Sequence, residues 1–186
     1  MHKRILRPLL YRLGPFGVAA LLFALVGAPS ALAGTNTIQN PGFETGTFAY
    51  WGGGGSFGAY AAITPYNAHS GSYSAVIGYP YRPANIDTVI NQYVYVPVFQ
   101  PTLTFWIRPQ CAHVDDDGLR VQVRDLVIPG FFQELINECT TSTSWIQRTV
   151  NMSAFAGRYV ELRFEVLTRG RGSMATYTLL DDVSLT

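Results

Sequence analysis

Two short motifs, one near each end of the chain, contain carboxylates that could bind a metal. The first covers residues 40–44 (NPGFE) and the second residues 180–185 (LDDVSL). Because the first and last strands of a β-sandwich often lie side by side, we expect Glu44 and Asp181 to converge. A buried carboxylate without a partner is unfavourable. The simplest partner for two converging carboxylates is a hard cation such as calcium, which prefers oxygen ligands.

Cys111 and Cys139 are the only cysteines in the chain. In an exported protein the default expectation is one disulfide. It would close a loop of about 29 residues and stabilise the fold by roughly 3.5 kcal/mol through the lost entropy of the unfolded chain. A metal pair and a free thiol are the alternatives. A zinc site fits poorly, because only His113 lies near and a closed site needs a fourth ligand.

Signals for catalysis are weak. After residue 33 the only histidines are His69 and His113, and there is neither a Gly-x-Ser-x-Gly elbow nor a His-Glu-x-x-His helix. Ser70 follows His69 but has no orienting acid nearby in sequence. Paired-carboxylate glycosidase chemistry is left open by spacing alone. The acidic run at 115–117 predicts a hairpin turn, because a helix–loop–helix calcium site needs an acid at its twelfth position, where Leu126 stands.

The first 33 residues are typical of a cleaved signal peptide. Four Lys or Arg residues precede residue 13, an apolar run covers 16–26, and Ala31-Leu32-Ala33 supplies the small residues that a signal peptidase reads. The apolar run is shorter than the ~20 residues of a membrane-spanning helix, which favours cleavage over a retained anchor. We expect a secreted, extracellular protein with one mature domain, residues 34–186.

The composition of this mature domain excludes some partners. Four of the 13 basic residues lie before residue 34, so nine arginines remain against 12 Asp and Glu, a net charge of −3. A mildly acidic domain without a basic run argues against nucleic acid or an anionic membrane as its partner. In the full 186-residue sequence, charged residues make up only 13% and aromatic residues 13%, a composition that suits an extracellular β-sandwich better than a helical enzyme.

Period-two alternation of apolar and polar residues dominates the mature chain. Glycine- and proline-rich turn signals, including the glycine run 52–55, separate the strands, residues 153–157 predict one helical turn, and Trp51 is expected in the core. This pattern predicts an all-β fold, a two-sheet antiparallel β-sandwich of jelly-roll type. The expected strands are 57–64, 73–78, 86–98, 102–111, 119–127, 131–136, 144–151, 158–168 and 175–185.

Alternation also assigns side chains to faces. In residues 103–108 the expected core set is Leu103, Phe105 and Ile107, with the residues between them outside. If three of the strands share a sheet, one face carries aromatic, arginine and glutamine side chains suited to a glycan. Sugar rings pack on Tyr and Trp, and their hydroxyls pair with Arg and Gln; Arg would also admit acidic sugars. Cross-strand pairing without any ligand is the alternative. The candidate ligand-binding residues are Tyr93, Tyr95, Trp106, Arg108, Gln122 and Arg124.

Several motifs, in order along the mature chain, together resemble one family. They are NPGFE at 40–44, Trp51, AHSGSYS at 68–74, INQYVYVP at 90–97, LTFW at 103–106, Trp145, SAFAG at 153–157, VELRF at 160–164 and LDDVSL at 180–185. This order is similar to that of carbohydrate-binding modules of the cellulose-binding family-four/nine (CenC-like) group, within the galactose-binding-domain-like superfamily.

The resemblance implies a jelly roll without a catalytic centre and with a structural calcium. At matched positions Glu44 and Asp181 would supply carboxylate oxygens, and a carbonyl near Ser72 a further ligand. The family's sugar-binding residues vary and do not carry over.

Three functions follow for testing. The first is a secreted, non-catalytic, monomeric module that binds an extracellular or cell-wall glycan. The second is a structural or adhesive domain that binds proteins or itself, which the absence of a catalytic domain favours. The third is a small glycoside hydrolase or lyase.

Overall fold

The computed structural model describes residues 35–55, 60–81, 85–128, 130, 132–169 and 174–186. The chain divides into two units, Met1–Leu32 and Ala33–Thr186, and the fold described here belongs to the second. The predicted signal peptide, residues 1–33, lies outside the described residues. Within the described ranges, no helix has the length and apolar character needed to cross a membrane.

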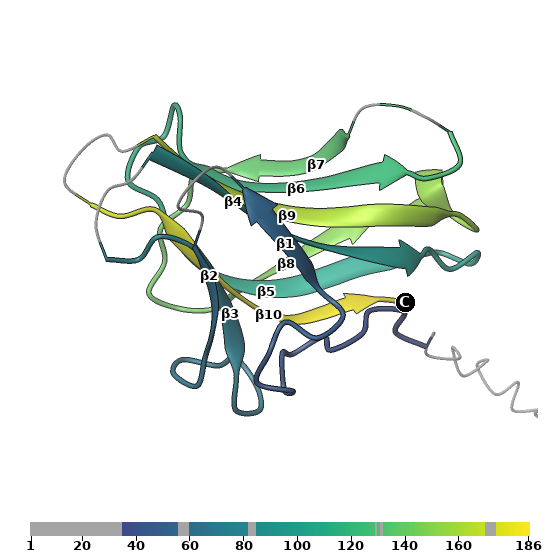
Figure 1. Ribbon diagram of the computed structural model, residues 1–186. Helices are drawn as coiled ribbons and strands as arrows, with labels where there is room; N and C mark the ends of the chain where they lie inside the picture. Colours follow the sequence, from purple (N-terminus) through teal and green to yellow (C-terminus); the bar gives the residue numbers. More distant parts are fainter. Residues whose placement is uncertain (1–34, 56–59, 82–84, 129, 131, 170–173) are drawn as a thin grey trace, which may run out of the picture. The chain divides into compact units, whose positions relative to one another are not determined.

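Two antiparallel five-stranded sheets pack face to face (Figure 1). This confirms the predicted all-β sandwich. Sheet A has the strand order β1 (Gly52–Gly55), β4 (Asn85–Tyr95), β9 (Tyr159–Arg169), β6 (Gly118–Asp125) and β7 (Gln133–Glu138). Sheet B has the order β2 (Ala61–Thr64), β3 (Ser74–Gly78), β10 (Tyr177–Leu185), β5 (Thr102–Gln110) and β8 (Ile146–Asn151).

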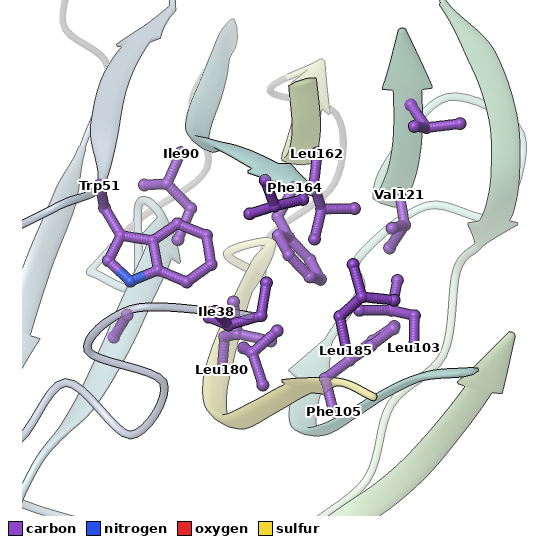
Figure 2. Close-up of a cluster of buried hydrophobic side chains, with 14 of the residues drawn as sticks. Ile38, Trp51, Ile90, Leu103, Phe105, Val121, Leu162, Phe164, Leu180 and Leu185 are labelled. Atoms are coloured by element: carbon purple, nitrogen blue, oxygen red, sulfur yellow. The ribbon is translucent and has the colours of Figure 1, made fainter. Parts of the chain in front are cut away.

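The core lies between the sheets and follows the predicted alternation. On β5, Leu103, Phe105 and Ile107 are fully buried, as predicted. Phe105 meets Phe164 of β9 edge to face, with ring centroids 5.1 Å apart. Figure 2 shows side chains of both sheets pointing toward each other across this layer. Removing such apolar surface from water stabilises the fold by about 25 cal/mol per Å².

The glycine run at 52–55, expected to be a turn, is instead the edge strand β1. It pairs with β4, Gly52 opposite Asn91. Backbone hydrogen bonds make this pairing, so it needs no side chains. The preceding Trp51 is buried, as predicted, and its Nε1 donates to the carbonyl of Asn40 at 3.1 Å. This anchor holds the glycines beside β4.

Most other elements agree with the prediction within a few residues. The helical turn is the 3₁₀ turn Ser153–Phe155. The strand expected over 57–64 is described from Ala61 onward, and residues 57–59 lie outside the described residues. The turn at 115–117 is present, but it joins β5 of sheet B to β6 of sheet A, so it is not a hairpin.

Two links join the sheets on the side of β7 and β8. The predicted disulfide between Cys111 and Cys139 is present, with Cα atoms 5.3 Å apart. It ties the residue after β5 to the residue after β7. Arg148 of β8 also donates two hydrogen bonds of 2.8 Å to the carboxylate of Glu138 on β7. Both links therefore join β7, an edge strand of sheet A, to sheet B, the disulfide beside β5 and the ion pair at the edge strand β8.

Replacing both cysteines should therefore lower stability without changing the fold. The Cys111→Ser/Cys139→Ser variant should lose about 3.5 kcal/mol of unfolding free energy, because the unfolded chain regains the entropy of an open loop. Denaturant unfolding measures this loss. Reductant should destabilise the wild type by a similar amount and leave the double variant unchanged. Two reactive thiols in the untreated, folded wild type would contradict the disulfide.

Candidate functional site

The six predicted ligand-binding residues do not share one face. Tyr93 and Tyr95 lie on β4, and Gln122 and Arg124 on β6, all in sheet A. Trp106 and Arg108 lie on β5, which belongs to sheet B. The prediction of a single platform is therefore wrong for these two residues. Alternation along β5 correctly places them outside the core, but it carries no information about which sheet the strand joins.

The outer side of sheet A gathers the other four residues around β9. Strand register places Tyr93 opposite Glu161, and Glu161 opposite Arg124. The neighbouring row contains Asn91, Arg163 and Gln122. We call this surface the sheet A face. Its residues from β4, β6 and β9 include Asn91, Tyr93, Tyr95, Arg120, Gln122, Arg124, Tyr159, Glu161, Arg163, Glu165 and Arg169.

The arginines of the sheet A face are paired with carboxylates. Arg124 Nη2 donates to Oε2 of Glu161, whose Oε1 accepts from Asn91 Nδ2 at 3.1 Å. Arg163 Nη2 donates to Oε1 of Glu165 at 2.7 Å. The remaining pairs are Arg120 with Glu134, 3.6 Å between Nε and Oε2, and Arg169 with Asp87.

Burial makes two of these pairs rigid. Glu161 and Glu165 are each only 7% exposed, and a buried carboxylate is tolerated only when charged hydrogen bonds compensate it. The guanidinium carbons of Arg124 and Arg163 also lie 4.9 and 5.0 Å from the ring centre of Phe132, a favourable cation–π geometry. These two arginine–glutamate pairs are therefore held in fixed positions.

Tyrosines line the β4 side of the sheet A face. Tyr93 is 62% exposed. Tyr95 packs against Tyr159 of β9, with ring centroids 5.2 Å apart. On the β6 side, a depression of about 340 Å³ is lined by Arg124 and Asp125 of β6 and by Leu126 and Gly130 of the following loop. Aromatic rings thus flank a hydrogen-bonding floor.

Sequence reasoning did not include β9 in this face. The alternation of residues 160–166 does place Glu161, Arg163 and Glu165 outside the core, and Tyr159 falls in the same phase. That signal was available in the sequence. The pairing of β9 between β4 and β6 was not, because it is a long-range contact.

Trp106 and Arg108 hold a loop against sheet B. The ring of His69 stacks on Trp106 with centroids 3.9 Å apart and planes 16° from parallel, and Trp145 meets the same histidine edge-on at 5.6 Å. Arg108 Nη1 donates to Oδ1 of Asn67 at 3.1 Å. The residues between β2 and β3 therefore cover part of the surface expected to bind a sugar.

The first described segment lies beside the last strand, as predicted. Thr37 N donates to the carbonyl of Leu185, and Val183 N to the carbonyl of Pro41, both at 3.0 Å. A methyl group on Gly42 would lie 3.4 Å from Oδ1 of Asp181 and 3.6 Å from Cγ of Glu44. The two carboxylate side chains thus flank the same glycine.

Backbone N–H groups hold both carboxylates. Asp181 is fully buried, and its Oδ2 accepts from the N–H of His69 at 2.7 Å and of Ser70 at 3.3 Å. Burial nevertheless raises the pKa of Asp181 to about 6. Glu44 is exposed and accepts from the N–H of Ser72 and of Tyr73 at 3.0 Å. In the part of the chain that the structure describes, no group of three or more His, Cys, Asp or Glu side chains is arranged to hold a metal ion.

Asp182 supplies the acid that sequence reasoning did not find near His69 and Ser70. His69 Nδ1 lies 2.6 Å from Asp182 Oδ2, and Ser70 Oγ donates to Asp182 Oδ1 at 2.7 Å. In a serine hydrolase the hydroxyl instead donates to the imidazole, which removes its proton. Here the serine proton is directed at the carboxylate, so the arrangement does not activate Ser70 as a nucleophile.

Comparison with known proteins supports the fold. No protein-family model matches the chain, and no curated relative matches its sequence. Solved structures do match. The carbohydrate-binding module TmCBM61, in complex with beta-1,4-galactotriose, is 21% identical with a TM-score of 0.62, covering 82% of this chain and 99% of that one. The CBM22-1 xylan-binding domain of Paenibacillus barcinonensis Xyn10C is 19% identical with a TM-score of 0.52, covering 77% and 89%.

A third match is an adhesin domain. The K3 cleaved adhesin domain of Lys-gingipain from Porphyromonas gingivalis is 21% identical with a TM-score of 0.58, covering 81% of this chain and 98% of that one. At these identities the matches establish a shared β-sandwich. The chain has the fold of carbohydrate-binding modules.

The stacking of His69 on Trp106 predicts a structural role for this tryptophan. Trp106→Ala should lower the unfolding free energy by about 2 kcal/mol, because it removes the aromatic surface on which the loop rests. The matched control is Gln147→Ala, an exposed neighbour opposite Trp106 in register; it should change stability by less than about 0.5 kcal/mol. Denaturant unfolding measures both. Equal stability of the Trp106→Ala variant and the wild type would contradict the assignment.

Proposed function

We propose that this chain is a secreted, non-catalytic carbohydrate-binding module that binds an extracellular or cell-wall glycan on its sheet A face. The observation that carries the proposal is the exposed Tyr93, which lies beside hydrogen-bonded polar side chains of β4, β9 and β6. A sugar ring can pack its C–H surface on the tyrosine. Its hydroxyls can then reach Asn91, Gln122 and the Arg124–Glu161 pair, which offer both donors and acceptors.

The pairing of charges favours neutral sugars. Four arginines and four carboxylates of this region pair one to one. A uronic acid would have to compete with Glu161 or Glu165 for its arginine, and would meet carboxylate repulsion. A neutral hydroxyl can instead donate to the glutamate and accept from the arginine. The xylan-binding and galactotriose-bound modules that share this fold are consistent with that class of ligand.

Glycoside hydrolysis fits this face poorly. Its two buried glutamates, Glu161 and Glu165, are four residues apart on one strand, so their Cα atoms are separated by about 13 Å. Retaining and inverting glycosidases place their carboxyl groups about 5 to 9.5 Å apart. The carboxylate of each glutamate also accepts a hydrogen bond from an arginine of the same face, so it is already engaged by a neighbouring side chain. A binding role needs neither feature.

Adhesion to a protein partner or to a second copy is the second candidate. Several apolar side chains are exposed in the loops that follow β4 and β6, among them Phe99 (89%), Val127 (74%) and Ile128 (57%). Exposed apolar side chains of this kind often mark interaction surfaces. Self-association together with no binding to any glycan would favour this candidate over the monomeric glycan-binding module.

Tyr93→Ala should weaken glycan binding about tenfold, the effect of losing a contact worth about 1.4 kcal/mol. Affinity electrophoresis against galactan, xylan and other neutral polysaccharides measures the effect, with polygalacturonate as the acidic probe. Tyr66→Ala is the control, because Tyr66 is 73% exposed but lies in the loop after β2 of sheet B. Equal binding by the wild type and the Tyr93→Ala variant would exclude the sheet A face as the glycan-binding site. Tighter binding to polygalacturonate than to the neutral polysaccharides would exclude neutral sugars as the preferred ligand.

Calcium is proposed as a structural ligand between the first segment and the last strand. Glu44 and Asp181 would hold it, together with a carbonyl near Ser72. Within the described residues no arginine pairs with Glu44, Asp181 or Asp182, and the ring that contacts Asp182 is that of His69. Asp181 Oδ1 and Glu44 Oε2 each accept a single N–H, from Asp182 and Ser72, and so keep a second lone pair. A cation there would offset the burial of Asp181.

Calcium should raise the melting temperature, and a chelator should lower it. At a calcium concentration 100 times Kd, binding to the folded state alone adds about 2.7 kcal/mol. Asp181→Asn should abolish this response, while Asp116→Asn, in the turn after β5, should keep it. Differential scanning calorimetry with and without calcium measures the shift, with magnesium as the ion control. A melting temperature that changes neither with calcium nor with chelator would contradict the proposed calcium site.

A further inference from the structure

Three tyrosines from two connections pack together beside the edge of sheet B. Tyr60 immediately precedes β2, and Tyr79 and Tyr81 follow β3. The ring centroids are 5.5 Å apart for Tyr60 and Tyr79, 5.8 Å for Tyr60 and Tyr81, and 5.5 Å for Tyr79 and Tyr81, with planes close to perpendicular. The hydroxyl oxygens of Tyr60 and Tyr81 are 3.3 Å apart. Neither the glycan site nor the proposed calcium site uses these residues.

Tyr60 is tied to both sheets through its backbone. Its N–H donates to Thr88 Oγ1 of β4 at 3.2 Å, and its carbonyl accepts from the N–H of Gly78 on β3 at 3.0 Å. The backbone that carries the Tyr60 ring is therefore anchored to both sheets. Tyr81, by contrast, is 72% exposed. A solvent-borne oxidant can reach one member of the pair, and the other is held in place beside it.

From this geometry we propose that Tyr60 and Tyr81 are a site of oxidative cross-linking, joined by a carbon–carbon bond between ring carbons ortho to the hydroxyls. The ortho carbons adjoin the hydroxyl-bearing carbons, so hydroxyls 3.3 Å apart bring them close. A turn of the exposed Tyr81 side chain completes the approach. The disulfide is compatible with an oxidising compartment, but oxidation of a phenol requires a stronger, one-electron oxidant.

The reaction needs an oxidant that removes one electron from each phenol. That oxidant is hydrogen peroxide, acting through a haem peroxidase. Each phenol loses one electron and its hydroxyl proton and becomes a phenoxyl radical. The two radicals couple at their ortho carbons, and the two ortho hydrogens then move to the oxygens and restore both phenols. Two hydrogen atoms are lost in total, and one peroxide is reduced to two waters.

The cross-link would staple the connection before β2 to the turn after β3. These residues are 21 apart in sequence. Since Tyr60 already bonds to β3 and β4, the added bond would lock the edge of sheet B to sheet A. The oxidised protein should melt at a higher temperature than the untreated protein.

The test treats the purified mature protein with peroxidase and limiting peroxide. We expect a monomer lighter by two hydrogen atoms, with dityrosine fluorescence and one joined peptide pair that contains residues 60 and 81. Tyr60→Phe and Tyr81→Phe keep both rings and the fold, and each should lose the fluorescence and the joined peptides. Tyr66→Phe, an exposed tyrosine outside the cluster, and Tyr79→Phe should keep both.

Three results would overturn the proposal. One is a cross-link that persists in Tyr60→Phe or maps to another pair, such as Tyr95 with Tyr159. Another is a product formed only between chains. The third is the absence of any product while free tyrosine in the same mixture is oxidised. Melting curves of the Phe variants before treatment establish that each is folded.

Discussion

The side chains proposed to bind a glycan point outward because their neighbours along each strand point inward. The two sheets are held together by the apolar layer around Phe105 and Phe164. Burying that layer requires each long strand to turn alternate residues to solvent. The residues turned to solvent by sheet A make up the sheet A face. A one-residue slip of β4 or β9 would therefore turn its tyrosines or glutamates into the core and its apolar residues to solvent.

The chemistry of the sheet A face is set by partners and not by residue types alone. Arginine and tyrosine on an open sheet suggest an acidic ligand when read singly. The structure pairs each described arginine of this face with a carboxylate and packs two of them on Phe132. Those contacts remove the free positive charge that a uronic acid would require. What remains is a rigid surface of hydrogen-bonding groups beside exposed tyrosine rings.

The contact between the first described segment and the last strand, β10, depends on the loop between β2 and β3. This loop supplies the N–H groups that bind Asp181 and Glu44, and it rests on Trp106 through His69. A methyl group on Gly71 would lie 2.5 Å from the Glu44 carboxylate, and its φ of +63° also favours glycine. Aromatic packing on sheet B and carboxylate binding are therefore parts of one structure.

The sequence by itself determined the features that depend on local order. Alternation located nine of the described strands and correctly buried Leu103 and Phe105, and the cysteine pair and the 3₁₀ turn were predicted as observed. Only the tertiary structure decided which strands share a sheet. It separated Trp106 from Tyr93, inserted β9 into the candidate face, made a strand of the glycines at 52–55 and brought Asp182 to His69. The reason is physical: side-chain alternation repeats every two residues along one strand, whereas strand pairing depends on contacts between residues far apart in the chain.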